Sequence, residues 1–222
     1  MFDRIELLIG KENLEKLNST NILIVGIGGV GGFVLETIIR SGIGNITIVD
    51  GDVVDISNLN RQVISNTSNI GLEKVNVAIN RCMSINPNCN VVAKNEFINQ
   101  DNINNYKGFD YIIDACDDVA AKVLLIKYAL DNNIKIISCM GTGKRINPGD
   151  VLLSTLDKTY NDPLAKVMRN RLKKENISTK IPVVFSKELP LNNEKTIASC
   201  MIVPCTAAMH IAYYVINDII KK

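Results

Sequence analysis

Two cations, an amide and a carboxylate are spaced along the first half of the chain as candidates for binding a nucleotide. Arg61 and Lys74 can surround a polyphosphate with positive charge, the first as a planar fork and the second as a point charge. Asn58 can hydrogen-bond a phosphate or a ribose without adding charge. Asp117 follows an expected strand, at the edge where open α/β sheets bind ligands. Attack at the α-phosphorus of a nucleotide requires cations around the phosphates and a carboxylate for Mg²⁺, and these residue types can support that chemistry.

A glycine-rich segment precedes these residues and joins an expected strand to an expected helix. The glycines expected to approach a ligand are Gly26, Gly28, Gly29 and Gly31. Glycine lets the backbone come close to a phosphate, and the helix beyond presents free N–H groups and a positive dipole end. Asp50 stands 24 positions after Gly26, where its carboxylate can accept from ribose hydroxyls. This pattern fits NAD as well as ATP, and its simplest alternative is a turn that only packs a helix on a strand.

The order of apolar and amphipathic segments predicts the fold that positions these residues. Short apolar runs that suit buried strands alternate with helical patterns, which is typical of a parallel α/β sheet. We expect strands at 21–25, 45–49, 91–93, 109–113 and 135–138, and helices at 11–17, 32–40, 72–84, 117–130, 162–174 and 207–220. After residue 141 the pattern weakens into a glycine-rich loop and an irregular stretch at 177–195. The expected fold class is α/β, a Rossmann-like nucleotide-binding sheet of mostly parallel strands with flanking helices and a mixed C-terminal extension.

Composition is that of an ordinary globular protein. The 222 residues are 46% hydrophobic and 22% charged, and the formal net charge of +2 argues neither for nor against nucleic acid. The six cysteines form no Cys-x-x-Cys pair, so we expect no zinc site. No apolar run reaches the roughly 18 residues that a membrane helix requires, so we expect no membrane association and a cytoplasmic location with reduced cysteines.

The segment after Asp50 decides between the two nucleotides. Its motifs accompany the glycine loop: Asp52, Asn58-Leu59-Asn60-Arg61-Gln62, Gly71-Leu72-x-Lys74 and Asp114-Ala115-Cys116-Asp117. On these motifs, residues 10–149 resemble the ubiquitin-activating-like superfamily, which includes ubiquitin-activating enzymes and the adenylyltransferases for molybdopterin and thiamine sulfur carriers. The resemblance implies ATP as the nucleotide, attachment of AMP to a carboxylate, a homodimer, and Mg²⁺ held with ATP by Asp117.

The resemblance also implies roles for individual residues. ATP would be bound by the four glycines together with Asp50, Asp52, Asn58, Arg61, Lys74 and Asp117. Arg61, Lys74 and Asp117 would also be catalytic, as would Arg4, which is expected to reach from one subunit into its partner's site. A monovalent cation is an optional further cofactor. Asp114 is a weaker candidate that we expect to be structural at its strand end.

Nearly the whole chain most resembles one subgroup, the tRNA threonylcarbamoyladenosine dehydratases. The likeness rests on residues 6–10 with Gly42-Ile43-Gly44, on the absence of Cys-x-x-Cys pairs, and on the second-half motif Lys158-Thr159-x-x-Asp162-Pro163-Leu164-Ala165 with Met168-Arg169-x-x-Leu172. It implies that ATP adenylates the carboxylate of the modified nucleoside in tRNA and that the neighbouring carbamoyl group then closes a ring. No linker divides the chain, so we expect one adenylating domain, residues 1–222, with a nucleotide-binding half at about 19–140 and a substrate-binding and dimerisation half at about 141–222.

Five basic residues are candidates for contacting that tRNA. Lys144 and Arg145 stand in the glycine-rich loop, and Lys166, Arg169 and Lys173 follow one another at helical spacing. The alternative for the helix is a solvated basic face without a partner. Because ring closure within one side chain needs no protein nucleophile, we expect His210 and the cysteines to be structural.

Three other functions fit part of the pattern. An adenylyltransferase for the C-terminus of a ubiquitin-like sulfur carrier shares the ATP site, and a sulfur-transfer-type protein is a further expected partner. An NAD-dependent oxidoreductase explains the glycines and Asp50 but gives no role to Arg61, Gln62, Lys74 and Asp117. A nucleotide-sensing or RNA-binding module with a degenerate site is the third, and the intact set of charged residues argues against it.

Overall fold

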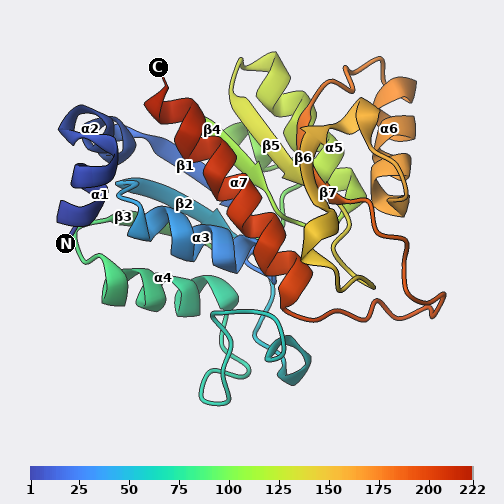
Figure 1. Ribbon diagram of the computed structural model, residues 1–222, viewed down its shortest axis with the longest axis horizontal. Helices are drawn as coiled ribbons and strands as arrows, with labels where there is room; N and C mark the ends of the chain where they lie inside the picture. Colours follow the sequence, from blue (N-terminus) through green and yellow to red (C-terminus); the bar gives the residue numbers. More distant parts are fainter. Residues whose placement is uncertain (222) are drawn as a thin grey trace.

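A computed structural model describes residues 1–221, and within them seven strands form one sheet (Figure 1). The strands are β1 (Asn21–Val25), β2 (Asn45–Val49), β3 (Asn90–Lys94), β4 (Tyr111–Asp114), β5 (Lys135–Cys139), β6 (Val151–Thr155) and β7 (Pro182–Ser186). They lie in the order β3-β2-β1-β4-β5-β7-β6. Neighbouring strands are parallel except for β6, which pairs with β7 in the antiparallel sense. The α/β fold class predicted from the sequence is confirmed.

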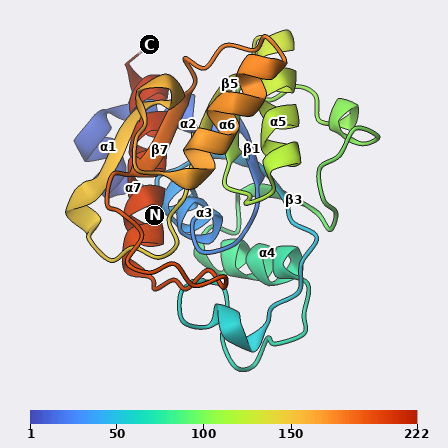
Figure 2. The same cartoon turned by 90° about the vertical axis from the view of Figure 1, so that its right-hand side faces the viewer.

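Helices cover both faces of this sheet. On one face lie α3 (Gly31–Arg40), α4 (Lys74–Ile85) and α7 (Ile202–Ile220), and on the other lie α5 (Val119–Asp131) and α6 (Pro163–Lys174). Figure 2 shows α7 and α5 on opposite sides of the strands. The helices α1 (Asp3–Ile9) and α2 (Lys11–Ser19) precede β1 at one end of the sheet.

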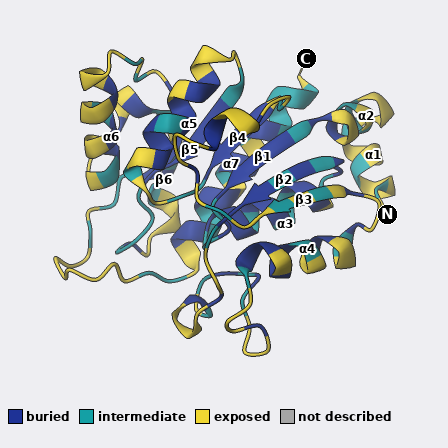
Figure 3. Ribbon diagram, turned by 180° about the vertical axis from the view of Figure 1, so that it is seen from behind, coloured by how far each residue is buried: buried dark blue, intermediate teal, exposed yellow. Residues whose placement is uncertain are grey.

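The central strands divide their side chains between two cores. Ile22 and Ile24 of β1 pack in the core beneath α3 and α7, whereas Leu23 and Val25 pack in the core beneath α5. This alternation follows from the two-residue period of a strand, and it explains why apolar residues follow one another without a break from Ile22 to Val25. Figure 3 shows the result: buried strands between helices that expose only their outer faces.

Two boundaries differ from the prediction because an aspartate ends or begins an element. The fourth strand begins at Tyr111 instead of 109, since the Asp110 carboxylate accepts a hydrogen bond from the Asn21 backbone N–H at 2.8 Å. Helix α5 begins at Val119 instead of 117, since Asp118 is its N-cap and accepts from the Ala121 N–H at 2.7 Å.

Four elements were missed, left without bounds or shortened in the prediction. Helix α1 and strand β6 were not predicted, β7 lies within the stretch 177–195 that was predicted only as irregular strand and loop, and α7 begins at Ile202 instead of 207. β6 is an edge strand whose pairing depends on β7, a partner that the sequence does not mark clearly. Pro204 lies in the first turn of α7, where a missing N–H costs nothing, so it begins the helix and does not interrupt it. Within residues 1–221, no helix combines the length and apolar character that a membrane span requires.

Candidate active site

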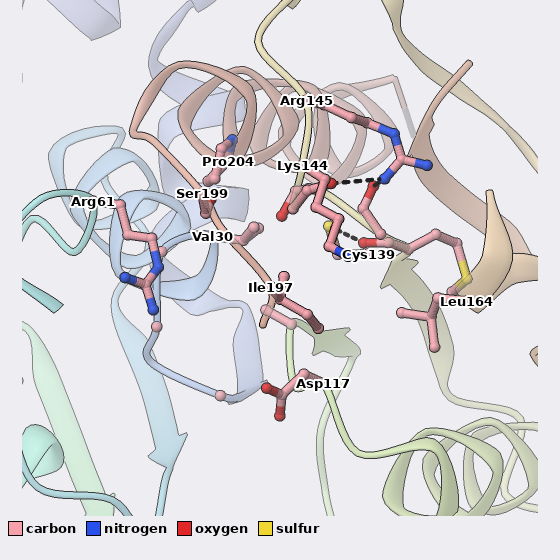
Figure 4. Close-up of a pocket in the computed structure, with 18 of the residues that line it drawn as sticks. Val30, Arg61, Asp117, Cys139, Lys144, Arg145, Leu164, Ile197, Ser199 and Pro204 are labelled. Carbon is pink, nitrogen blue, oxygen red and sulfur yellow. Dashed lines mark hydrogen bonds between the residues drawn. The ribbon is translucent and has the colours of Figure 1, made fainter. Parts of the chain in front are cut away.

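A cavity of about 700 Å³ opens at the carboxyl ends of β1, β2, β4 and β5 (Figure 4). The glycine loop, the segment after β2 and the loop after β4 form one side, and the loop after β5 and parts of segment 190–204 form the other. It brings together most of the predicted residues: Gly26, Gly28, Gly29, Asp50, Asp52, Asn58, Arg61, Lys74, Asp117, Lys144 and Arg145.

The glycine loop fits between β1 and α3 only because it lacks side chains. Gly26 has φ +89°, and a Cβ there would lie 2.8 Å from the backbone of Ala115. A Cβ on Gly31 would lie 1.8 Å from the carbonyl oxygen of Gly26, so Gly31 serves close packing of α3 and does not line the cavity. Gly28 and Gly29 do line it. The loop therefore presents bare backbone and the N-terminus of α3 to a ligand.

Asp50 already has backbone partners. One carboxylate oxygen accepts from the Ile27 N–H at 2.6 Å and the other from the Asp52 N–H at 2.8 Å. The residue is buried at the end of β2. These bonds hold the carboxylate rigidly beside the glycine loop, and each oxygen retains a lone pair for a ribose hydroxyl.

Lys74 begins α4 and forms an ion pair with Asp52 in the cavity. The Nζ of Lys74 lies 2.8 Å from the Asp52 carboxylate. The lysine side chain is only 6% exposed, whereas that of Asp52 is 54% exposed. The N-terminus of α4 adds its positive dipole end to the lysine charge, so both favour a polyphosphate.

Arg61 belongs to a turn that begins with a short 3-10 helix, Ile56–Asn58. Asn58 is buried, and its side-chain oxygen accepts from the Asp55 N–H at 3.0 Å, which fixes the turn. The Arg61 guanidinium donates to the Ser57 carbonyl at 2.6 Å and to the Asn60 side chain at 2.9 Å. Both partners are exposed and neutral, so the guanidinium keeps its charge available to an anion.

The loop after β4 carries one buried and one exposed carboxylate. Asp114 is completely buried and accepts from Lys122, as expected of a structural residue. Asp117 is exposed at the cavity, and within the described part of the chain it makes no hydrogen bond or ion pair. Figure 4 shows Asp117 and Arg61 as separate walls of one opening, with Ile197 from the opposite side between them.

The opposite wall is closed by residues 189–199, which we call the strap. Lys144 holds it: the Lys144 N–H donates to the Ala198 carbonyl at 2.7 Å, and the Leu191 N–H donates to the Lys144 carbonyl at 2.9 Å. Its ammonium group donates to the Glu194 carbonyl. Ile197 sits on Gly143, where a Cβ would lie 2.4 Å from its side chain. Lys144 thus fixes the strap over the cavity, and its contact with tRNA stays a prediction.

Arg145 has a different role from the predicted tRNA contact. Its side chain is buried, and the guanidinium donates to carbonyl oxygens of four residues: Gly141, Gly143, Asn161 and Glu188. These bonds occupy the fork and join the loop after β5 to two distant loops. We reassign Arg145 to support of the cavity wall, because its buried guanidinium is held by four backbone carbonyl oxygens.

The three predicted basic residues of α6 differ in exposure. Lys166 and Lys173 are exposed, whereas Arg169 is half-buried and donates to the carbonyl of Thr159 at 3.0 Å. Arg169 therefore ties α6 to the preceding loop, and contact of these residues with tRNA stays a prediction. Arg4 lies exposed on α1 and does not line the cavity of its own chain.

Several cavity residues were not predicted. Gln62 is 6% exposed, and its side-chain oxygen has no hydrogen-bond partner among the described residues. Its place directly after Arg61 was the available signal. Thr142, Asn192 and Ser199 come from the loop after β5 and from the strap, where no periodic pattern marks them.

The cavity cysteines are poor nucleophiles. Burial, reinforced by the Asp114 carboxylate, raises the pKa of Cys116 well above the ordinary value for a thiol. Burial likewise raises the pKa of Cys139 to about 12. Since the thiolate is the reactive form, both agree with the structural role expected of them. Among residues 1–221 no cluster of three His, Cys, Asp or Glu side chains is placed to hold a metal ion.

Comparison with known proteins gives consistent matches. The model of the ThiF family matches residues 2–147. The chain is 37% identical over 240 residues to the tRNA threonylcarbamoyladenosine dehydratase of Bacillus subtilis (strain 168), in a match that covers 99% of this chain and 94% of the relative.

Solved structures show the same likeness. The chain is similar to E. coli tRNA N6-threonylcarbamoyladenosine dehydratase, TcdA, in complex with ATP, with a TM-score of 0.94 and 33% identity, covering 99% of this chain and 93% of that one. The complex of TcdA with AMP gives a TM-score of 0.94 and 32% identity, covering 98% and 93%.

Proposed function

Since this chain belongs to the ThiF family, as its motifs indicated, we propose that it is an ATP-dependent enzyme that dehydrates N6-threonylcarbamoyladenosine in tRNA. The observation that carries the proposal is the cavity in which bare glycine backbone, Arg61, Lys74 and Asp117 converge. The near full-length likeness to a dehydratase of that nucleoside supports the choice of substrate.

The first step is adenylation of the substrate carboxylate. A carboxylate oxygen of the threonyl side chain attacks the α-phosphorus of ATP, and the bond to the pyrophosphate leaving group breaks. Arg61 and Lys74 neutralise charge that develops on the phosphate oxygens, and the N-termini of α3 and α4 add their N–H donors and dipoles. Asp50 would hold the ribose, which orients the phosphates toward Arg61 and Lys74 on the cavity wall.

Asp117 is the residue that we propose to hold Mg²⁺ with ATP. Its carboxylate is exposed in the cavity and unpaired within the described residues. One protein carboxylate suffices, because Mg²⁺ keeps several waters and takes further ligands from the phosphates. When bound, the ion supplies charge stabilisation to the phosphates and the leaving group. We assign no residues to a monovalent cation.

The second step closes the ring. The carbamoyl group of the same side chain attacks the activated carbonyl, the bond from that carbonyl to AMP breaks, and the proton released in ring closure passes to solvent. Because both reacting groups belong to one side chain, proximity supplies much of the rate. The strap encloses this end of the cavity and excludes water that would otherwise hydrolyse the adenylate.

We propose further that the protein is a homodimer in which Arg4 completes the site of the partner subunit. Arg4 is exposed and lies outside the cavity of its own chain, which is the arrangement that donation across subunits requires. Mixing subunits that carry Arg4→Ala with subunits that carry Asp117→Ala tests this. Recovered activity in the mixed dimers supports donation, and its absence contradicts it.

The remaining assignments are also proposals. Lys166 and Lys173 on the exposed side of α6 would contact tRNA phosphates, and the tRNA substrate would place the reaction in the cytoplasm. A single adenylating domain with a nucleotide-binding and a substrate-binding half agrees with one sheet that continues through both. A sulfur-transfer-type protein partner stays a prediction.

The deciding experiment is mass spectrometry of the nucleosides from tRNA that carries threonylcarbamoyladenosine, incubated with the protein, ATP and Mg²⁺. We expect the modified nucleoside to lose one water, with one AMP and one pyrophosphate formed for each. Arg61→Ala, which alters an exposed turn and no core packing, is the matched inactive control.

Two other results would replace this proposal. An adenylate formed on a small carrier protein ending in Gly-Gly, without any change in tRNA, would make the protein a carrier adenylyltransferase. Tight binding of NADH without binding of ATP would make it an oxidoreductase.

A further inference from the structure

A completely buried charge cluster lies directly behind the loop that carries Asp117. The Nζ of Lys122, on α5, lies 2.9 Å from the Asp114 carboxylate, and both side chains are 0% exposed. The same ammonium donates to the Ser138 hydroxyl at 3.3 Å and to the Cys139 carbonyl at 2.7 Å. Three acceptors therefore satisfy its three N–H donors. Burial, the largest single effect, opposes the lysine charge, but the Asp114 carboxylate together with Cys116 and Cys139 outweighs it, so the pKa of Lys122 is raised.

Stability alone does not explain such a cluster. Removing two charges from water is costly, and well-packed apolar residues often replace a buried ion pair without loss of stability. A fully satisfied buried network does, however, restrict the groups that it binds to one arrangement. The role of Lys122, Asp114, Ser138 and Cys139 therefore depends on which parts of the chain their hydrogen bonds hold in place.

The cluster connects two walls of the cavity. The second carboxylate oxygen of Asp114 accepts from the Cys116 N–H at 3.3 Å and from its Sγ at 3.1 Å, one residue before Asp117. Cys139, whose carbonyl Lys122 binds, ends β5 and leads into Met140 and Gly141 of the opposite wall. Lys122 thus sits at the junction of both loops, while the Asp117 carboxylate faces the cavity.

We infer that Lys122, Asp114 and Ser138 are positioning residues that hold the loop 115–117 so that Asp117 faces the magnesium-bound phosphates of ATP. This inference rests on the proposed role of Asp117 and not on the identity of the carboxylate that is adenylated. Its consequence is that loss of the cluster lowers affinity for Mg²⁺ with ATP and lowers kcat, while the KM for tRNA stays unchanged.

The test separates positioning from stability with a double variant. Lys122→Met alone leaves a buried carboxylate without its counter-charge, so the melting temperature of this variant should fall. Asp114→Asn combined with Lys122→Met removes both charges and should recover most of that loss. We nevertheless expect the double variant to need at least tenfold more Mg²⁺ for half-maximal ATP binding, measured by calorimetry without tRNA, and to lose at least tenfold in kcat.

Two further variants make the result decisive. Lys127→Met changes an exposed lysine on the same helix and should match the wild type in every measurement. Ser138→Ala removes one hydroxyl and keeps the ion pair, so it remains informative if the double variant does not fold, and it should shift the Mg²⁺ requirement in the same direction by a smaller factor. If the double variant folds, an unchanged Mg²⁺ requirement in it would overturn the inference. If it does not fold, an unchanged Mg²⁺ requirement in Ser138→Ala would do so.

The binding measurement also separates this inference from the proposed function. It contains only protein, ATP and Mg²⁺, so a shifted Mg²⁺ requirement in the variants supports positioning whatever the second substrate is. If the variants show this shift but the wild-type protein leaves tRNA unchanged, the proposed reaction alone is contradicted.

Discussion

Two substitutions in the glycine loop should affect different properties: Gly31→Ala the stability of the fold, and Gly28→Ala the affinity for ATP. Gly31→Ala would place a Cβ 1.8 Å from the Gly26 carbonyl oxygen, and contacts shorter than 3.0 Å essentially do not occur, so the loop and α3 must separate by about 1.2 Å. The backbone fixes the position of the Cβ, and the carbonyl belongs to the backbone, so no rotamer change relieves the clash. Gly28→Ala meets only the Gln62 side chain at 3.8 Å, an ordinary contact distance.

The expected magnitudes follow from these distances. Overpacking of this kind costs about 1–3 kcal/mol, which for a chain of this length corresponds to a fall in melting temperature of about 2–12 °C. Gly28→Ala should change the melting temperature by less than about 1 °C. Its methyl group would nevertheless occupy the space through which a phosphate approaches the backbone, so its affinity for ATP should fall about tenfold or more.

Thermal unfolding followed by circular dichroism and calorimetric titration with ATP measure the two effects separately. The reasoning fails if Gly31→Ala has the melting temperature of the wild type, because the close approach of α3 would then not be required. It also fails if Gly28→Ala binds ATP normally, because the phosphates would then lie elsewhere in the cavity.

Three other predictions concern charge and burial. Lys74→Met should weaken ATP binding about 10- to 100-fold in a calorimetric titration, as expected for removal of a charge-assisted hydrogen bond. The same substitution should barely alter the melting temperature, because the Asp52 carboxylate is exposed enough to be solvated without the lysine. Lys166→Gln with Lys173→Gln should lower the slope of log Kd for tRNA against log salt by about one for each phosphate that these lysines neutralise, and an unchanged slope would exclude α6 from the interface. Burial raises the pKa values of Cys82 and Cys139 to about 12 in the folded protein, whereas the same thiols ionise near pH 9 in the unfolded chain. Between these pH values the folded state therefore binds more protons than the unfolded state. The free energy of unfolding, measured with urea, should fall as pH rises from about 9 toward 12.

The sequence predicts the parts of the fold that local physics dictates. Strands β1 and β2 were predicted with their observed bounds, because each is a short, mostly apolar run rich in Ile and Val. The cavity side chains of the first half were also predicted together. Parallel strands bring their carboxyl ends to one edge, so residues that follow β1, β2 and β4 must meet there.

The second half was less predictable because its structure depends on distant partners. Strand β6 is defined by pairing with β7, and the strap is defined by backbone bonds to Lys144. From the sequence alone Arg145 is predicted to be a surface cation, because nothing local indicates that the carbonyls of Asn161 and Glu188 accept its hydrogen bonds in the fold. Lys122 likewise reads as an exposed helix residue, and only the close approach of Asp114 and Ser138 makes its burial possible.

The two backbone donors of Asp50 have a consequence for sugar selectivity. A carboxylate that relied on the ribose for its hydrogen bonds would be left unsatisfied by a deoxynucleotide and would reject it strongly. Asp50 is satisfied by the Ile27 and Asp52 N–H groups whichever sugar is present. A 2′-deoxy analogue of ATP therefore forfeits one hydrogen bond and creates no orphaned charge, so the enzyme should tolerate it with only a modest increase in Kd.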